Sequence, residues 1–144
     1  LAGGGSLLVS TSRRTPREAM DLCQPLLQLP HVLHRWDVDK DNPYLGMIAC
    51  ADAIIVTGDS LSMCAEACAT GVPVFIYGAP NVAPPKHQLL HKALITRGLA
   101  HPLNNASRID WQPVGTLDDV GRVASEIRKR FPSIFPVAET GPLR

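Results

Sequence analysis

The chain has 144 residues, of which 45% are hydrophobic and 19% are charged, and its formal net charge is +1. This length fits one domain with a sizeable core, and the small net charge argues against bulk electrostatic capture of nucleic acid. No apolar run approaches the roughly 20 residues that a membrane span requires, and none resembles a secretory signal. These totals favour a soluble globular domain without nucleic acid as a partner.

Predicted strands and helices alternate along the chain. Short apolar runs predict strands at residues 7–10, 31–36, 53–56, 72–77 and 99–103, the third and fourth being buried on both faces. Helices are expected at residues 15–30, 44–51, 62–70, 86–97 and 116–131. The alternation predicts an α/β fold, Rossmann-like, with a doubly wound parallel sheet covered by helices on both sides. We expect one domain over residues 1–131 and an irregular tail over residues 132–144.

Three of the predicted helices carry clear signals. Thr15 and Glu18 have the spacing of a capping box, with Pro25 expected to kink the helix that follows. The helix at 44–51 is apolar nearly all round, which predicts burial. Thr116 is expected to cap the last helix, whose amphipathic pattern gives it an apolar stripe: Val120, Val123, Ala124, Ile127 and Phe131.

The four cysteines, Cys23, Cys50, Cys64 and Cys68, lie among small apolar residues in predicted helices. This placement favours reduced, buried thiols and a reducing compartment over a disulfide framework. A glycine stretch at residues 3–5, just before the first strand, resembles the end of a preceding helix. We therefore expect a piece of a longer chain, in which the domain lacks its own first strand.

The turn at residues 58–62, Gly-Asp-Ser-Leu-Ser, joins an apolar strand to a helix at the edge where parallel sheets bind ligands. Ser60 and Ser62 offer hydroxyls and backbone N–H groups that suit phosphate or carboxylate, but one serine or Asp59 could equally cap the helix and do nothing more. The charge of Asp59 would repel a phosphate unless its side chain points away. Glu66, one turn after Ser62, can accept two hydrogen bonds from the diol of a ribose, or it is an exposed glutamate without a role.

Basic and polar residues follow two other strands at the same edge. Arg13 and Arg14 are fixed positive charges that suit a diphosphate, although arginines are also common on surfaces. Lys86 and Gln88 lie at a loop–helix junction, where they could reach an anion or a sugar hydroxyl. Together with the turn at 58–62, these residues predict one anion-binding edge.

Metal sites and two classes of enzyme are disfavoured. Asp37, Asp39 and Asp41 lack the glycine and the distal glutamate of a calcium loop, so we expect a solvated loop. The pairs His87–His91 and Cys64–Cys68 are each half of a conceivable zinc site, but nothing in the spacing joins them. The turn lacks the second glycine of a Gly-x-Ser-x-Gly elbow, and no Gly-x-Gly-x-x-Gly follows the first strand, which disfavours a hydrolase of that type and a dinucleotide-dependent epimerase.

Several motifs together resemble the mitochondrial-fission "elongated mitochondria" family, whose bacterial members are often labelled nucleoside-diphosphate-sugar epimerases. The motifs cover most of the chain to residue 131, and they are Ser12-Arg13-Arg14-Thr15-Pro16, Asn42-Pro43-Tyr44-Leu45-Gly46-Met47, Ala51 to Thr57, Asp59-Ser60-Leu61-Ser62-Met63 with Glu66-Ala67, and Gly71-Val72-Pro73-Val74. More distantly, the segment from Ala51 through Gly71-Val72-Pro73 to Lys86-His87-Gln88 is similar to the carboxyl-terminal domain of GT-B glycosyltransferases such as MurG.

The GT-B resemblance implies specific roles. It places the diphosphate at the turn of Ser60 to Met63, the nucleotide ribose at Glu66 and the donor sugar at Gln88. This chain departs from the MurG pattern at Ser60, where that pattern has glycine, and at Asp59, which adds a charge. The resemblance also implies an amino-terminal domain of the same protein that supplies the acceptor site and usually the catalytic base.

The residues and the resemblance together predict the carboxyl-terminal half of a GT-B protein that binds a nucleotide-diphosphate sugar, without a cofactor or a metal. The parent protein would be a metal-independent glycosyltransferase, cytoplasmic or peripheral to a membrane through the missing domain or the acceptor. The alternative is a non-catalytic adaptor that keeps the fold, as the fission role of plant relatives implies.

Overall fold

A computed structural model describes residues 5–28, 30–36, 38, 41–78, 83–104 and 110–135. The elements in chain order are β1 (Leu7–Ser10), α1 (Arg17–Cys23), η1 (Gln24–Leu26), β2 (His31–His34), α2 (Tyr44–Cys50), β3 (Ile54–Thr57), α3 (Leu61–Ala69), β4 (Val74–Tyr77), η2 (Pro85–His87), α4 (Gln88–Thr96), β5 (His101–Pro102) and α5 (Asp119–Arg130). Strands alternate with helices, and all three strand pairings in this part of the chain are parallel. The predicted Rossmann-like α/β class is confirmed.

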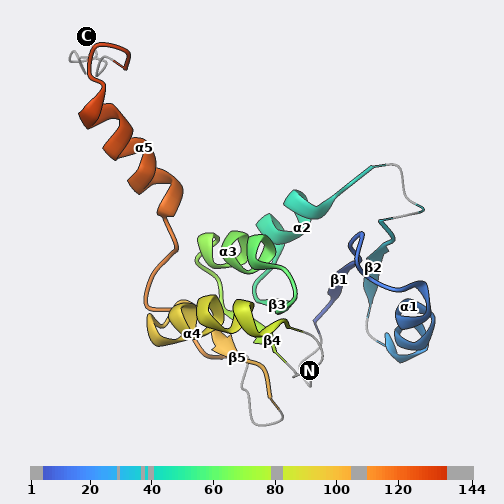
Figure 1. Cartoon of the computed structure of the whole chain (residues 1–144). Coiled ribbons are helices and arrows are strands. Elements are labelled where there is room, and N and C mark those ends of the chain that lie inside the picture. Colours follow the sequence, from blue (N-terminus) through green and yellow to red (C-terminus); the bar gives the residue numbers. More distant parts are fainter. Residues whose placement is uncertain are drawn as a thin grey trace.

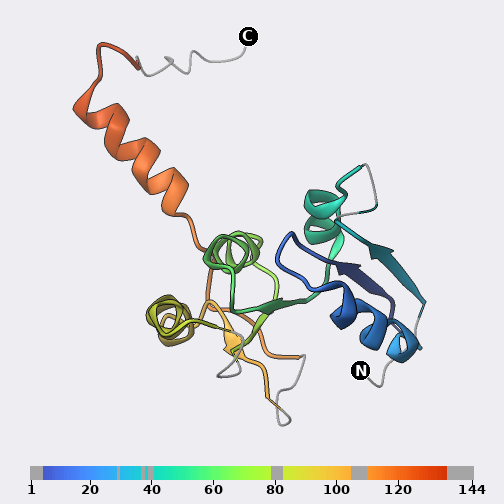
Figure 2. The same cartoon turned by 45° about the vertical axis from the view of Figure 1, so that its right-hand side comes forward.

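The strands form two separate sheets (Figures 1 and 2). β1 pairs with β2, with Leu7 opposite His31. β3, β4 and β5 form the second sheet in that order, with Ile54 opposite Val74 and Phe75 opposite His101. The parallel, open arrangement agrees with the sequence, but the described strands do not join into a single sheet.

The core lies around β4, the central strand of the second sheet. Val74, Phe75 and Ile76 are all nearly inaccessible to solvent. Val74 and Ile76 form one cluster with Cys64, Ala67 and Cys68 of α3, and further buried side chains of this cluster come from α4 and the segments that follow it: Leu94, Leu99, Ala100 and Leu117. Phe75 instead packs its ring near those of His101 and Trp111. Burying side chains of the size of valine, leucine or phenylalanine stabilises a fold by about 1.5–3 kcal/mol each, so this cluster is the main source of stability in the described part of the chain.

β3 is less buried than its apolar sequence suggests. It has β4 as a neighbour on one side only, and the structure describes no strand on the other side. Val56 is buried, whereas Ile55 is 52% exposed and Thr57 is also exposed. The prediction that this strand is buried on both faces is therefore wrong for the described structure, because full burial requires neighbours that β3 does not have here.

α2 also departs from the expected burial. Its first residue, Tyr44, donates its backbone N–H to Asn42 Oδ1 at 3.0 Å, just before the helix begins after Pro43. None of its residues is buried, however, and Leu45 is 72% exposed. An apolar sequence favours burial, but it does not supply the surface that would cover the helix.

α1 begins and ends differently from the prediction. Thr15 Oγ1 accepts the backbone N–H of Ser12 at 3.0 Å within the preceding turn and does not cap α1, so the capping box is wrong. The helix ends at Cys23, and Pro25 lies in the 3-10 turn η1 rather than at a kink. Proline cannot donate the hydrogen bond that would continue an α-helix.

α5 extends away from the rest of the chain (Figures 1 and 2). Asp118 caps it in place of Thr116, since Asp118 Oδ1 accepts the backbone N–H of Gly121 at 2.9 Å. The helix is amphipathic as predicted, but four residues of its apolar stripe are between 41% and 83% exposed: Val120, Val123, Ile127 and Phe131. The apolar face of α5 is therefore uncovered in the described part of the chain.

The cysteines are free, and only two of them are buried. Cys64 and Cys68 lie in the core, as predicted, whereas Cys23 and Cys50 are the exposed last residues of α1 and α2. Residues 1–4, Asp37, Asp39 and all residues after Phe135 lie outside the described residues, so the expectations for the glycine stretch, the acidic loop and the tail stay predictions. Among the helices of the described chain, none combines the length and apolarity that a membrane span needs.

Candidate functional site

The loop after β1 presents two arginines at the carboxyl end of that strand. Ser12 and Thr15 close a tight turn, with the backbone N–H of Thr15 donating to Ser12 O at 2.9 Å, and the N–H of Arg14 donates to Ser12 Oγ at 3.2 Å. Both arginines are exposed on this turn. Arg14 Nε lies 3.4 Å from Asp59 Oδ2, so the loop after β1 contacts the turn after β3.

This ion pair reduces the repulsion that the charge of Asp59 would exert on a phosphate bound at the turn. The side chain of Asp59 is partly buried and its charge is turned toward Arg14. A paired carboxylate repels an incoming anion less than a free one, because the guanidinium compensates its field at short range. The pairing also means that part of the positive charge of Arg14 is compensated by Asp59 and attracts an anion less strongly.

The turn after β3 leads directly into α3, as the sequence predicts. Ser60 is buried and caps the helix, and its Oγ accepts the backbone N–H of Met63 at a long 3.5 Å. Ser62 is exposed in the first turn of the helix. Ser60 and the N–H of Met63 thus serve the cap, while Ser62 and the start of the helix dipole remain open to solvent.

Glu66 has a protein partner that the sequence did not reveal. Tyr44 of α2 donates its hydroxyl to Glu66 Oε2 at 2.9 Å, although Glu66 itself is exposed. Burial raises the pKa of Tyr44 above its ordinary value, and the hydrogen bond to Glu66 and its negative charge raise this pKa further. The other carboxylate oxygen of Glu66 stays available to a ligand.

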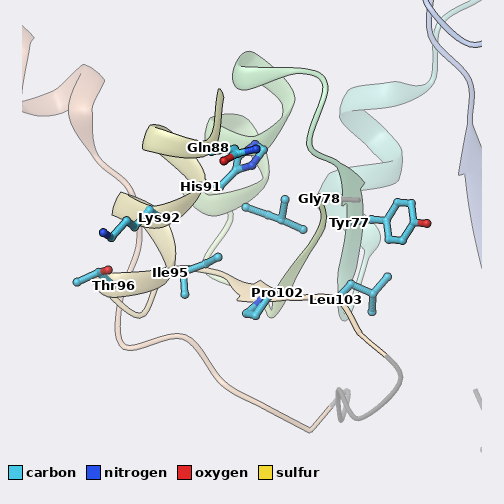
Figure 3. A pocket seen from close by; sticks show the side chains of 10 residues that line it. Tyr77, Gly78, Gln88, His91, Lys92, Ile95, Thr96, Pro102 and Leu103 are labelled. Carbon is cyan, nitrogen blue, oxygen red and sulfur yellow. The ribbon is translucent and has the colours of Figure 1, made fainter. Parts of the chain in front are cut away.

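A cavity of about 490 Å³ opens beside the same edge of the second sheet (Figure 3). Gln88, His91 and Lys92 line it from α4, while Tyr77 and Leu103 line it from the ends of β4 and β5. The cavity offers an amide, an imidazole and an ammonium group within a largely apolar wall. Such a combination is typical of sites for small polar molecules.

His91 connects this cavity with the turn after β3. His91 is 7% exposed, its ring lies against Gly58, and its Nε2 is 4.0 Å from Cys64 Sγ. His87 Nδ1 lies 3.4 Å from Gly58 O, so both histidines of the pair approach the same glycine. Burial lowers the pKa of His91, a hydrogen bond with the backbone of Gly58 partly opposes this shift, and the charge of a protonated His87 adds to it. The lowered pKa favours the neutral imidazole.

The structure brings together some of the predicted site residues and not others. Arg14 meets the turn of Ser60 and Met63 through Asp59, and Gln88 lines the cavity. Arg13 and Lys86 are exposed, without an ion pair to another predicted site residue in the described part of the chain. His91, Tyr44 and Lys92 were missed, although the i,i+4 spacing of His87 and His91 marks a pair on one face of the helix. Within the described residues, no three His, Cys, Asp or Glu side chains are placed to share a metal ion.

Comparison with known proteins adds the evolutionary relationship. A family model described as mitochondrial fission ELM1 matches residues 1–131. The chain belongs to this family. The resemblance to the elongated-mitochondria family is therefore confirmed, and the motifs that carry it include the turn after β3 and the loop after β1.

Two relatives show how much of a family member this chain represents. It is 31% identical over 123 residues to the uncharacterized protein RP120 of Rickettsia prowazekii, an alignment that covers 83% of this chain and 35% of that protein. It is 31% identical over 133 residues to the mitochondrial fission protein ELM1 of Arabidopsis thaliana, which covers 91% of this chain and 31% of that protein. The chain thus spans about a third of the length of these relatives. No solved structure matches it.

Proposed function

We propose that this domain binds a nucleotide-diphosphate sugar at the carboxyl ends of its strands. The observation that carries the proposal is the contact between Arg14 and Asp59, which brings the basic loop after β1 to the start of α3. Parallel α/β sheets bind ligands at this edge, and a helix start with adjacent arginines suits a diphosphate. The GT-B resemblance supports the same placement.

In this proposal each predicted group has one task. Arg13, Arg14 and the first turn of α3 at Ser62 hold the diphosphate, with the N–H of Met63 contributing to the field of the helix start. Glu66 accepts hydrogen bonds from the ribose through the oxygen that Tyr44 leaves available. Gln88 and Lys86 approach the donor sugar, and the cavity next to Gln88 offers space for it.

The reaction that such a site supports in the longer protein is transfer of the sugar to an acceptor. The bond from the sugar to the diphosphate breaks, and the leaving diphosphate gains negative charge that the arginines and the helix start stabilise. The acceptor and its base belong to another domain in this proposal. Binding of the donor can be tested separately from transfer.

Thermal unfolding of the full-length protein with added nucleoside diphosphates tests the donor site. A ligand at a hundred times its Kd stabilises the native state by about 2.7 kcal/mol, which for a domain of this size raises the Tm by about 5–10 °C, and less if the longer protein unfolds as a single unit. Glu66→Ala should keep the fold and lose most of this shift. No shift with any nucleoside diphosphate at millimolar concentration would count against the proposal.

A second candidate function is a non-catalytic adaptor. The uncovered apolar face of α5 favours it, because exposed apolar stripes are surfaces that other proteins can cover. The printed name of the Arabidopsis relative refers to mitochondrial fission. An adaptor predicts that Glu66→Ala leaves partner binding unchanged, whereas Val123→Asp weakens it.

A further inference from the structure

β1 and β3 each have one edge without a strand partner in the described part of the chain. In a parallel strand, alternate residues direct their N–H and C=O groups to opposite edges. The N–H of Leu7 donates to Pro30 O at 2.8 Å and that of Thr11 donates to His34 O at 3.0 Å, so these residues and Val9 face β2. Leu8 and Ser10 therefore direct their backbone groups to the other edge.

The same reasoning defines the open edge of β3. The N–H of Ile54 donates to Pro73 O at 2.8 Å, and the N–H of Gly58 donates to Tyr77 O at 2.9 Å. Ile54, Val56 and Gly58 thus face β4, while Ile55 and Thr57 face away from it. We call Leu8, Ser10, Ile55 and Thr57 the open-edge residues.

The two open edges belong to neighbouring parts of the molecule. The ion pair of Arg14 and Asp59 joins the loops that follow β1 and β3, so the carboxyl ends of both strands lie on one side. Adjacent strands are about 4.8 Å apart, and strands with one strand between them are about 9.6 Å apart. The long side chain of an arginine is suited to reach across the end of one intervening strand.

We propose that one further parallel strand, from the part of the protein that precedes Leu1, lies between β1 and β3. It would join the two sheets into one six-stranded sheet, with β2 and β1 on one side of the new strand and β3, β4 and β5 on the other. This is the strand order of a doubly wound fold in which the first strand in sequence lies at the centre. The proposal does not depend on any ligand.

The connection and the length of the relatives support this occupant. A strand that precedes β1 in sequence and lies beside it needs a crossover of a dozen or more residues, usually a helix, which fits a right-handed unit leading into β1. About two thirds of the length of both relatives lies outside the matched region, which leaves room for such a unit. The new strand would also reduce the exposure of Leu8 and Ile55, now 41% and 52%.

Hydrogen exchange in the longer protein tests the proposal at single residues. The amides of the open-edge residues should exchange as slowly as those of Leu7, Val9, Ile54 and Val56, which face strands already present. If the open-edge amides exchange as fast as loop amides while these four controls are slow, no strand occupies the gap and the proposal is wrong. Protection that disappears on dilution to monomer would assign the edges to a second copy and would also overturn it.

Cysteine pairs distinguish an inserted strand from direct pairing of β1 with β3. A disulfide needs Cα atoms about 4.4–6.8 Å apart, which adjacent strands allow and strands separated by a third do not. In the longer protein with its exposed native cysteines replaced, Leu8→Cys with Val32→Cys should form a disulfide, because these residues are register partners. Leu8→Cys with Ile55→Cys or Thr57→Cys should not, and efficient bridging of either pair would overturn the proposal.

Discussion

The imidazole ring of His91 lies directly against Gly58, so closely that a Cβ on this glycine would be 2.5 Å from His91 Cε1. His91 belongs to α4 and lines the cavity, while Gly58 opens the turn that leads into α3. The contact therefore fixes the position of the turn relative to the cavity. Any ligand that touches both Ser62 and Gln88 depends on it.

Gly58→Ala should destabilise the protein. The added methyl group must displace a buried ring, and overpacking of this kind typically costs about 1–3 kcal/mol. Urea unfolding followed by circular dichroism measures the loss. Gly46→Ala is the matched control, because nothing lies within 4 Å of a Cβ there and alanine favours the helix interior, so it should be neutral or stabilising by up to about 1 kcal/mol. Equal effects of both variants would contradict this packing.

The stability of the protein should fall as the pH drops below about 6.5, and His91 should account for part of the fall. Burial holds the pKa of His91 in the folded state below its ordinary value of 6.5. Between these two pKa values the unfolded chain binds a proton that the folded chain does not, so the free energy of unfolding decreases as the pH falls. The contribution of neutral His91 to stability is complete above pH 6.5 and is lost as the pH falls through its pKa in the folded state. Urea unfolding at about pH 5 and about pH 7.5 checks this.

The variant His91→Gln should lose much of this pH dependence, whereas His31→Gln, at an exposed position, should keep it. The account of His91 fails if the glutamine variant shows the whole decrease in stability of the parent protein.

The two buried thiols should resist alkylation in the folded protein. Burial raises the pKa of Cys64 and of Cys68 to about 11, and for Cys64 the negative charges of Cys68 and Asp59 contribute further. Only about one thiol in a thousand is then ionised at pH 8, and the thiolate is the reactive form. Iodoacetamide with mass spectrometry should modify Cys23 and Cys50 in the folded state and the buried pair only in urea. Alkylation of Cys64 as fast as of Cys50 would contradict its burial.

Asp59→Asn should strengthen binding of a nucleoside diphosphate, and Arg14→Gln should weaken it. Removing the carboxylate removes a repulsive charge and releases Arg14, whereas removing the guanidinium loses a charge-assisted hydrogen bond. We expect changes of roughly threefold to tenfold in opposite directions, because the pair is partly exposed and screened. Calorimetric titration of the full-length protein measures them.

A matched control comes from another exposed ion pair far from the turn. Arg122 Nη1 and Asp119 Oδ1 are 3.4 Å apart on α5. Asp119→Asn and Arg122→Gln should leave nucleotide affinity unchanged. If the variants on α5 change nucleotide affinity as much as the variants at residues 14 and 59, the changes arise from net charge and not from a binding site at the turn.

The sequence predicts the local elements of this fold better than their surroundings. The turn at 58–62 and the alternation of strands and helices follow from apolar periodicity, serine at the helix start and glycine after the helix end, which are all local signals. Gly98 is an example, because this glycine with its positive φ of 66° follows directly on the helix predicted at 86–97, and α4 ends at Thr96. Burial was predicted less well. The apolar residues at Ile54 to Val56 and on α5 favour burial, but they become buried only where another part of the chain packs against them.

The site shows the same division. Arg14, Ser60 and Gln88 are found at the predicted edge because strand ends are fixed by sequence order in a parallel fold. The contacts between residues of the site come from long-range packing: Arg14 with Asp59, Glu66 with Tyr44 and Gly58 with His91. No spacing in the sequence encodes those three contacts.

The most direct test of nucleotide binding at this edge is an NMR titration of the isotope-labelled full-length protein with nucleoside diphosphates. The account predicts that the largest amide shift changes fall on the loop with Arg13 and Arg14, on Ser60 to Met63, on Glu66 and on Gln88, and that they saturate with one ligand per chain. Amides of α5 should not move. Absence of changes at millimolar ligand, or saturating changes that spare the turn at 58–62, would contradict the account.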